Sequence, residues 1–151
     1  MKGTTSILLV DDNRAWRETL AEFLRDQGFD VATAEGPLSG QALLDQAEFF
    51  AAVIDNHMAE MNGLDWLPEL CDRLPVLMLS SEDDPLTMEQ ALDEGALAFV
   101  SKSQPPRQLL PTLRRLLLLA FVVSVAQRIL SGGQPALTRL TRSRRGASGQ
   151  E

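Results

Sequence analysis

The chain has 151 residues, enough for one compact domain with a hydrophobic core and too few for a second domain of ordinary size. Its only cysteine, Cys71, excludes an intramolecular disulfide and favours a reducing, intracellular compartment. The formal net charge of −7 has two opposite parts, because residues 1–103 hold six basic and twenty acidic residues, whereas residues 104–151 hold eight basic residues and one acidic residue.

The first apolar segment, residues 6–10 (SILLV), is typical of a strand buried on both faces and ends at Asp11 and Asp12. Neither a secretory signal nor a membrane span would meet two aspartates so soon, so we expect a cytoplasmic protein. Residues 13–27 follow with apolar side chains at helical spacing. They end before Gly28, a residue that favours the positive φ found after a helix C-terminus.

This alternation of strand and helix continues along the chain. Further strands are predicted at 30–34, 50–54, 75–79 and 97–100, and helices at 37–47, 64–73 and 85–94, with a last helix from about Pro106. The pattern predicts a doubly wound α/β fold with five parallel strands and helices on both faces. For the strand order 2-1-3-4-5, ligands bind beyond the carboxyl ends of the strands, between the first and the third.

Polar residues stand at the predicted carboxyl ends of four strands. Asp11 and Asp12 follow the first strand and Asp55 follows the third, so the fold brings three carboxylates together, and their repulsion calls for a cation. Oxygen ligands of this kind suit Mg²⁺, which often shares a site with phosphate. Ser80 ends the fourth strand and Lys102 follows the fifth, and both can contact phosphoryl oxygens. A carboxylate nucleophile, a metal, a hydroxyl and a lysine together favour phosphoryl transfer.

Residues 55–63, DNHMAEMNG, resemble the receiver signature Asp-x-x-Met-Pro-x-x-x-Gly of two-component response regulators, and the aspartate pair, the serine and the lysine flank them in matching order. The resemblance implies a flavodoxin-like receiver domain in which Asp55 accepts a phosphoryl group from a sensor histidine kinase, a phosphotransfer protein or a small donor. It also implies Mg²⁺ as cofactor, held by Asp12, Asp55 and the backbone carbonyl of His57, with Asp11 bound through water.

The resemblance also assigns the switch. Lys102 and Ser80 would hold the aspartyl-phosphate, and Ser80 would shift toward it. Phe99 would then turn inward and remodel the surface of the fourth helix, fifth strand and fifth helix, although Phe99 could instead be plain core. The chain would not be an enzyme, and would show slow autodephosphorylation at most.

Two positions depart from the family pattern. Ala59 stands where the family usually has proline, so we expect the loop after Asp55 to be more mobile. Ser103 follows the lysine where the family commonly has proline with a cis peptide, and a non-proline cis bond costs about 2.5–4 kcal/mol. Whether this peptide is cis stays open.

The last helix is apolar nearly all round at 116–126 (LLLLAFVVSVA) and so has more than one face to bury. The run is shorter than the roughly 20 residues that span a membrane, so we predict no membrane insertion but homodimerisation, or partner docking, through this helix. Alternatively, the residues after it fold back to cover it. We predict a receiver domain at 5–125, followed at 126–151 by the end of the helix and a basic Gly/Ser/Arg-rich tail.

Three other functions are compatible with parts of this pattern. An aspartyl-phosphate hydrolase of the haloacid dehalogenase type also uses an aspartate and Mg²⁺, but would have a second aspartate where His57 stands. A receiver-like scaffold that is never phosphorylated would be favoured by a missing pocket residue. A nucleic-acid binder would use the basic tail, but residues after about 131 are too few for a helix-turn-helix domain, so specific DNA binding is not expected.

Overall fold

The computed structural model describes residues 5–81 and 84–145, with side chains as far as residue 132. Five strands form one parallel sheet in the order β2-β1-β3-β4-β5. The predicted fold and strand order are confirmed, and each strand limit differs from its prediction by at most one residue. The strands are β1 (Ser6–Val10), β2 (Asp30–Ala34), β3 (Ala51–Asp55), β4 (Val76–Ser80) and β5 (Ala98–Ser101).

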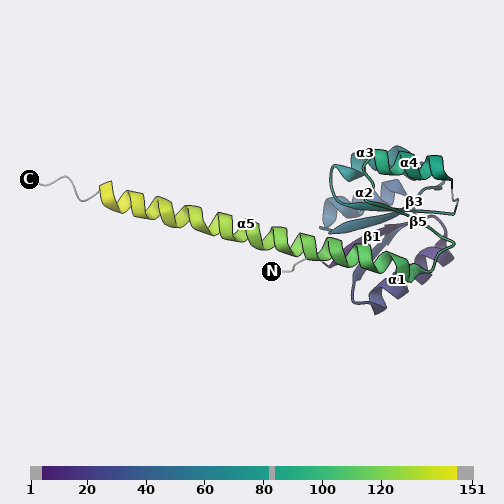
Figure 1. Cartoon of the computed structure of the whole chain (residues 1–151), viewed down its shortest axis with the longest axis horizontal. Coiled ribbons are helices and arrows are strands. Elements are labelled where there is room, and N and C mark those ends of the chain that lie inside the picture. Colours follow the sequence, from purple (N-terminus) through teal and green to yellow (C-terminus); the bar gives the residue numbers. More distant parts are fainter. Residues whose placement is uncertain (1–4, 82–83, 146–151) are drawn as a thin grey trace, which may run out of the picture. The chain divides into compact units, whose positions relative to one another are not determined.

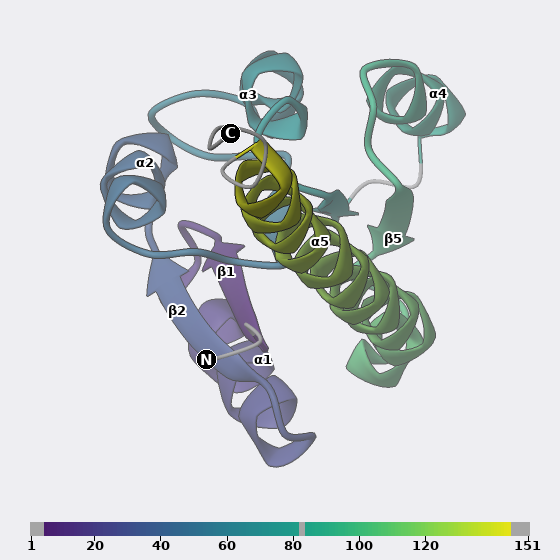
Figure 2. The same ribbon diagram turned by 90° about the vertical axis from the view of Figure 1, so that its left-hand side faces the viewer.

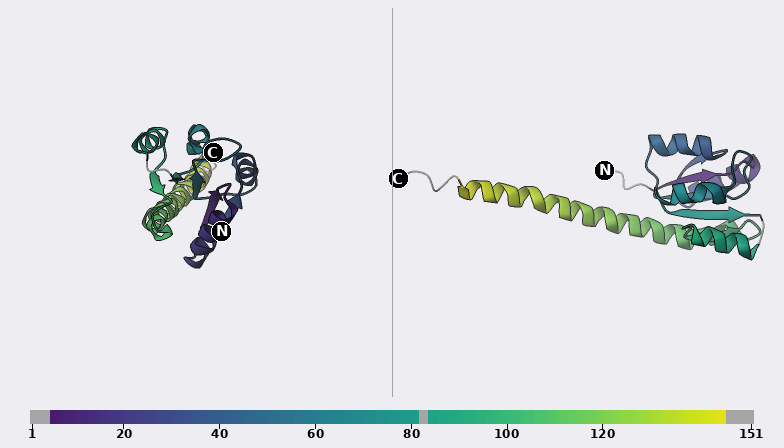
Figure 3. Two further views of the ribbon diagram at one scale, coloured as in Figure 1. Left: turned by 90° about the vertical axis from the view of Figure 1, so that its right-hand side faces the viewer. Right: turned by 90° about the horizontal axis from the view of Figure 1, so that it is seen from above.

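Helices cover both faces of this sheet. Figures 1 and 2 show α2, α3 and α4 on one face and α1 with the first turns of α5 on the other, and the end-on view in Figure 3 shows the same two layers. Because both faces are covered, β3 and β4 are buried throughout, and so is β1 after its first residue. The helices are α1 (Arg14–Asp26), α2 (Pro37–Gln46), α3 (Gly63–Cys71), α4 (Pro85–Asp93), a 3₁₀ helix η1 (Pro106–Leu109) and α5 (Leu110–Arg145).

The start of α1 is fixed directly after the acidic pair. The Asn13 side chain caps the helix by accepting a hydrogen bond from the Trp16 N–H at 3.0 Å. At the other end, Gly28 has a φ of +96°, as predicted for the residue after this helix. The cap therefore fixes the start of α1 two residues after Asp12.

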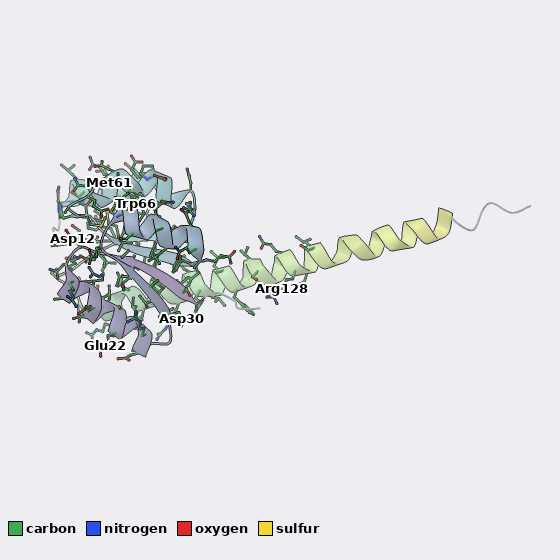
Figure 4. All side chains as sticks on the ribbon, turned by 180° about the vertical axis from the view of Figure 1, so that it is seen from behind. Asp12, Glu22, Asp30, Met61, Trp66 and Arg128 are labelled. Carbon is green, nitrogen blue, oxygen red and sulfur yellow. The ribbon has the colours of Figure 1, made fainter. Side chains whose placement is uncertain are left out.

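One side of the core lies between the sheet and the α2, α3 and α4 layer. Trp66 of α3, labelled in Figure 4, is buried there. Its ring fills the space beside Gly40, where an added Cβ would lie 2.9 Å from the ring. Trp66 is thus a packing residue of this core layer.

The chain divides into two compact units, Met1–Leu117 and Leu118–Glu151, and the boundary between them falls within α5. In the first unit, Leu110, Leu113 and Leu116 are buried. In the second, the helix continues to Arg145, and apolar side chains between Leu118 and Leu130 are exposed.

By length and composition alone, one helix of the described part, Pro106–Gly132, could cross a membrane. This stretch is longer than the apolar run at 116–126 on which our prediction of no membrane insertion was based. Such a helix by itself does not establish a membrane location. The predicted domain limit at residue 125 stays a prediction.

Gly63 provides a test of the packing at the start of α3. A Cβ at this position would lie 2.5 Å from the Asp55 backbone oxygen and 3.1 Å from the Asn56 Cα. Because both atoms belong to the backbone beside the site, we predict that Gly63→Ala lowers the free energy of unfolding by about 1–3 kcal/mol. Urea denaturation would measure the loss. Gly132→Ala, whose Cβ meets nothing within 4 Å, is the control, and equal stabilities of the two variants would contradict the prediction.

Candidate functional site

Three carboxylates meet beyond the carboxyl ends of β1 and β3. Val10 is paired with Ile54, so the residues that follow them in register, Asp11 and Asp55, lie side by side. Oxygen atoms of Asp11, Asp12 and Asp55 all lie within 4.8 Å of one another. Asp11 and Asp55 are buried, whereas Asp12, labelled at the end of the sheet in Figure 4, is exposed. The structure thus brings together the three carboxylates that the sequence placed at one crevice.

Lys102 supplies the positive charge at the centre of this cluster. Its Nζ lies 2.7 Å from Asp11 Oδ2 and 3.2 Å from Asp55 Oδ1, and its side chain is only 12% exposed. The Lys102 N–H donates to the Ser80 carbonyl at 2.7 Å, which ties the lysine to the end of β4. The ammonium also lies over the Trp16 ring, 4.8 Å from its centroid. Lys102 is therefore held by contacts from three strand ends and α1.

The charges of this cluster are unbalanced. Burial raises the pKa of Asp55 and is the largest cause of its shift, followed by the negative charge of Asp11. Lys102 lowers this pKa, and the charge of Asp12 raises it further. One ammonium stands against three carboxylates, so a further cation would relieve the repulsion. The ligand atoms are hard oxygens, which fit a divalent ion such as Mg²⁺ or Ca²⁺.

Arg17 holds the backbone of the site in place. This buried side chain on α1 donates from Nη1 to the Asp11 carbonyl at 2.7 Å, and its Nη2 lies 3.8 Å from Glu35. The Asn13 N–H donates to Asp11 Oδ1 at 2.9 Å. Sequence reasoning missed Arg17 and the contact of Trp16 with Lys102, because an arginine or a tryptophan in the first turns of a helix is typical of an exposed surface. The only signal was their position just after the aspartate pair.

The loop after Asp55 is anchored by hydrogen bonds that we did not predict. Asn56 is buried, and its carbonyl accepts from the Gly63 N–H at 2.7 Å while its Oδ1 accepts from the Leu64 N–H at 3.2 Å. The Ala59 N–H donates to Asp12 Oδ2 at 3.2 Å. The Ala59 N–H is a donor that proline would lack, and the greater mobility of this loop stays a prediction.

The remaining predicted site residues lie on or beside the same strand ends. Ser80 is fully buried at the end of β4. Phe99 is half-buried on β5 and packs against the core on the α2–α4 side. His57 is exposed, and the role of its backbone oxygen stays a prediction. No peptide bond in the described residues is cis, so the bond between Lys102 and Ser103 is trans.

The raised pKa of Asp55 predicts how stability depends on pH when no metal is bound. A carboxyl whose pKa is higher in the folded state contributes stability at low pH, and that contribution is lost as the pH rises through the folded-state pKa. We therefore predict that Asp55→Asn unfolds at a higher temperature than wild type at neutral pH with a chelator. The gain should shrink as the pH falls toward 3.8, the ordinary aspartate pKa. Glu22→Gln, an exposed change on α1, is the control. A gain in unfolding temperature that does not change with pH would contradict the attribution of the effect to the raised pKa of Asp55.

Comparison with known proteins gives a family for this arrangement. A family profile described as "Response regulator receiver domain" matches residues 7–114. The alginate biosynthesis transcriptional regulatory protein AlgB of Pseudomonas aeruginosa is 34% identical over 106 residues, which are 68% of this chain and 24% of AlgB. The transcriptional regulatory protein CpxR of Klebsiella pneumoniae is 33% identical over 133 residues, 87% of this chain and 56% of CpxR. The chain thus spans much less than the full length of these relatives.

A solved structure agrees with this assignment. It is a response regulator protein from Burkholderia pseudomallei with a phosphorylated aspartic acid, a calcium ion and citrate, and it superposes with a TM-score of 0.68 at 25% identity. The match covers 82% of this chain and 73% of that one. The family match covers well over half of the chain, and the acidic cluster, the serine and the lysine stand at the expected strand ends. The chain therefore belongs to the family of response regulator receiver domains, the phosphorelay modules of two-component systems.

Proposed function

We propose that Asp55 is the residue of this receiver that accepts the phosphoryl group, and that the donor is the phosphohistidine of a sensor histidine kinase or of a phosphotransfer protein. The observation that carries the proposal is the position of Lys102, with Nζ 2.7 Å from Asp11 Oδ2 and 3.2 Å from Asp55 Oδ1. A cation beside a buried carboxylate stands where negative charge accumulates when that carboxylate becomes an acyl phosphate.

The transfer forms a bond between an Asp55 oxygen and phosphorus and breaks the phosphorus–nitrogen bond of the donor histidine. The electron pair of the broken bond stays on the imidazole, which takes up a proton. Asp55 must be ionised to attack, and Lys102 favours this form because it lowers the pKa that burial raises. After transfer, Lys102 exchanges its contact with the Asp55 carboxylate for one with a phosphoryl oxygen and keeps its contact with Asp11.

The metal that we propose for this pocket is Mg²⁺. Receiver domains bind a divalent metal at their acidic pocket, and the oxygen donors of this chain fit such an ion. Asp12, Asp55 and the His57 carbonyl would hold it, with Asp11 bound through water. When bound, Mg²⁺ would supply positive charge that neutralises the phosphoryl oxygens.

In this proposal, Ser80 and Phe99 transmit the phosphorylation of Asp55 to the surface of the domain. The Ser80 hydroxyl moves to the phosphoryl group, and the half-buried Phe99 turns inward and changes the surface of α4, β5 and α5. The hydrogen bond from the Lys102 N–H to the Ser80 carbonyl supports this coupling, because it links the two strand ends beside Asp55. We place the chain in the cytoplasm, as a signalling module with slow autodephosphorylation at most.

Phosphorylation from a small donor tests the assignment of Asp55. With acetyl phosphate and Mg²⁺, the intact mass of wild type should increase by one phosphoryl group, while Asp55→Asn should gain none. Omission of Mg²⁺ should abolish the gain in wild type, because the phosphoryl charge then lacks its counterion. A stable, folded wild type that is not modified by any donor would contradict the proposal and favour a receiver-like scaffold that is never phosphorylated.

We further propose that α5 beyond Leu117 pairs with a second copy of this chain. Eight apolar residues of the segment form two stripes with a spacing of four, three and four residues, which is typical of a helix that packs against another helix. Most of these side chains are well exposed, Leu118 by 64% and Leu130 by 73%. The first stripe comprises Leu118, Val122, Val125 and Ile129, and the second comprises Leu119, Val123, Ala126 and Leu130.

A membrane fits this helix less well than a second copy. Leu109, Leu110, Leu113 and Leu116, which belong to the apolar stretch Pro106–Gly132, are buried in the receiver core. Beyond Leu117, the residues up to 132 extend about 22 Å as a helix. The hydrocarbon layer of a bilayer is about 30 Å thick. Within residues 118–132, the side opposite the stripes carries Ser124, Gln127 and Arg128 together with one large apolar residue, Phe121. This stretch contains a single basic residue, whereas membrane-surface helices are typically rich in Lys and Arg on their polar face.

Molar mass in solution tests the pairing. We predict that wild type elutes as a dimer at micromolar concentration in size-exclusion chromatography with light scattering. Val122→Glu with Ile129→Glu should elute as a monomer, because each buried charge weakens association at least about tenfold. Ser124→Glu, on the side of the helix opposite both stripes, should stay dimeric. A wild type that is monomeric at every concentration would contradict the proposal and leave lipid or another protein as the occupant.

A further inference from the structure

We propose that Ala59 is a positioning residue for the metal site, because its backbone N–H orients Asp12 for Mg²⁺. The inference rests on the proposed function and adds a residue that the family signature does not contain. Among the three carboxylates, Asp12 has the least support. Asp11 is fully buried and bonded to Lys102 and to the Asn13 N–H, and Asp55 is also bonded to Lys102. Asp12 is exposed, and its Oδ2 accepts a hydrogen bond from the Ala59 N–H at 3.2 Å.

The loop that carries Ala59 is fixed on both sides of this residue. On one side, the Asn56 carbonyl and side chain close the loop onto the start of α3. On the other side, Glu60 Oε2 accepts a hydrogen bond from the Leu38 N–H at 3.0 Å, in the first turn of α2. These two anchors hold the Ala59 N–H in place opposite Asp12.

The contact of Glu60 with α2 depends on a glycine. The residue before the helix, Gly36, makes no side-chain cap, and the Glu60 carboxylate takes this role. A Cβ at Gly36 would lie 2.7 Å from the carboxylate carbon of Glu60. An acidic group at a helix N-terminus is also stabilised by the helix dipole. Gly36 and Glu60 therefore form an anchor that reaches from α2 to the loop beside the metal ligands.

Proline at position 59 would remove this arrangement, because proline has no backbone N–H. The chain thus exchanges the fixed φ of the usual proline for a donor that points to a metal ligand. Hydrogen bonds to ligand carboxylates orient them, and their loss typically lowers metal affinity by about 10–100-fold. Because Asp12 is exposed, we expect the lower end of this range.

The test is an Mg²⁺ titration of the full chain and of two variants. Binding is followed by tryptophan fluorescence, since Trp16 lies 4.8 Å from Lys102 Nζ, and independently by the rise of the unfolding temperature with Mg²⁺ concentration. We expect Ala59→Pro to bind Mg²⁺ about tenfold more weakly than wild type. Ala59→Gly keeps the N–H and should bind within about twofold of wild type. Equal affinities of wild type and Ala59→Pro would overturn the inference.

A second comparison shows whether the donor acts through Asp12. In an Asp12→Ala background the N–H has no acceptor, so Ala59→Pro should change the Mg²⁺ affinity by less than about twofold. A tenfold loss in that background as well would overturn the inference. If Ala59→Pro does not fold, the comparison is made between Glu60→Ala and Glu60→Gln. The glutamine side chain can still accept a hydrogen bond from the Leu38 N–H, whereas alanine cannot. Weaker Mg²⁺ binding is then expected for Glu60→Ala alone, and equal binding would overturn the inference.

The outcome for wild type separates this inference from the function on which it rests. Wild type that binds no Mg²⁺ would overturn the proposed metal site and the role of Ala59 together. Wild type that binds Mg²⁺, with Ala59→Pro binding it equally well, would overturn only the role of Ala59.

Discussion

The contact of one ammonium with two buried carboxylates is the interaction on which the rest of this site depends. Lys102 follows β5, Asp11 follows β1 and Asp55 ends β3, so their approach to 2.7 and 3.2 Å requires the whole parallel sheet in its correct order. Without the lysine, two buried carboxylates would face each other uncompensated, which is strongly unfavourable. The fold therefore sets the geometry of the site, and the ion contacts make that geometry electrostatically tolerable.

The sequence predicted the strand ends well because they depend on simple periodic features. Asp11, Asp55 and Ser80 each end or follow an apolar run, and parallel strands bring such positions to one edge. Lys102 could be placed by the same rule. The observed strand limits differ from the predicted limits by no more than one residue. A doubly wound sheet leaves its strands little freedom of register. The positions of the proposed site residues were thus among the most predictable features of the chain.

The supporting contacts could not be predicted in this way. The Ala59 N–H and the Glu60 carboxylate act across loops, and Arg17 reaches a carbonyl six residues earlier, so none follows a helical or strand period. A sequence shows that proline is missing at position 59, but not that the freed N–H has an acceptor. It also shows that α5 is apolar nearly all round, but not that its buried part ends near Leu117.

The same contacts indicate which parts of the site can move when Asp55 is phosphorylated. Asp11 is fully buried and held through its carbonyl by Arg17 and through its side chain by Asn13 and Lys102. In the proposed mechanism, conversion of the Asp55 carboxylate to an acyl phosphate adds negative charge at a point where positive charge is already insufficient. The group that can follow the new charge is Lys102, because its flexible side chain already bridges both carboxylates. Its N–H is bonded to the Ser80 carbonyl. In the mechanism that we propose, a shift of Lys102 therefore acts directly on the end of β4, and the signal reaches the surface of α4, β5 and α5 through the backbone as well as through the Ser80 hydroxyl.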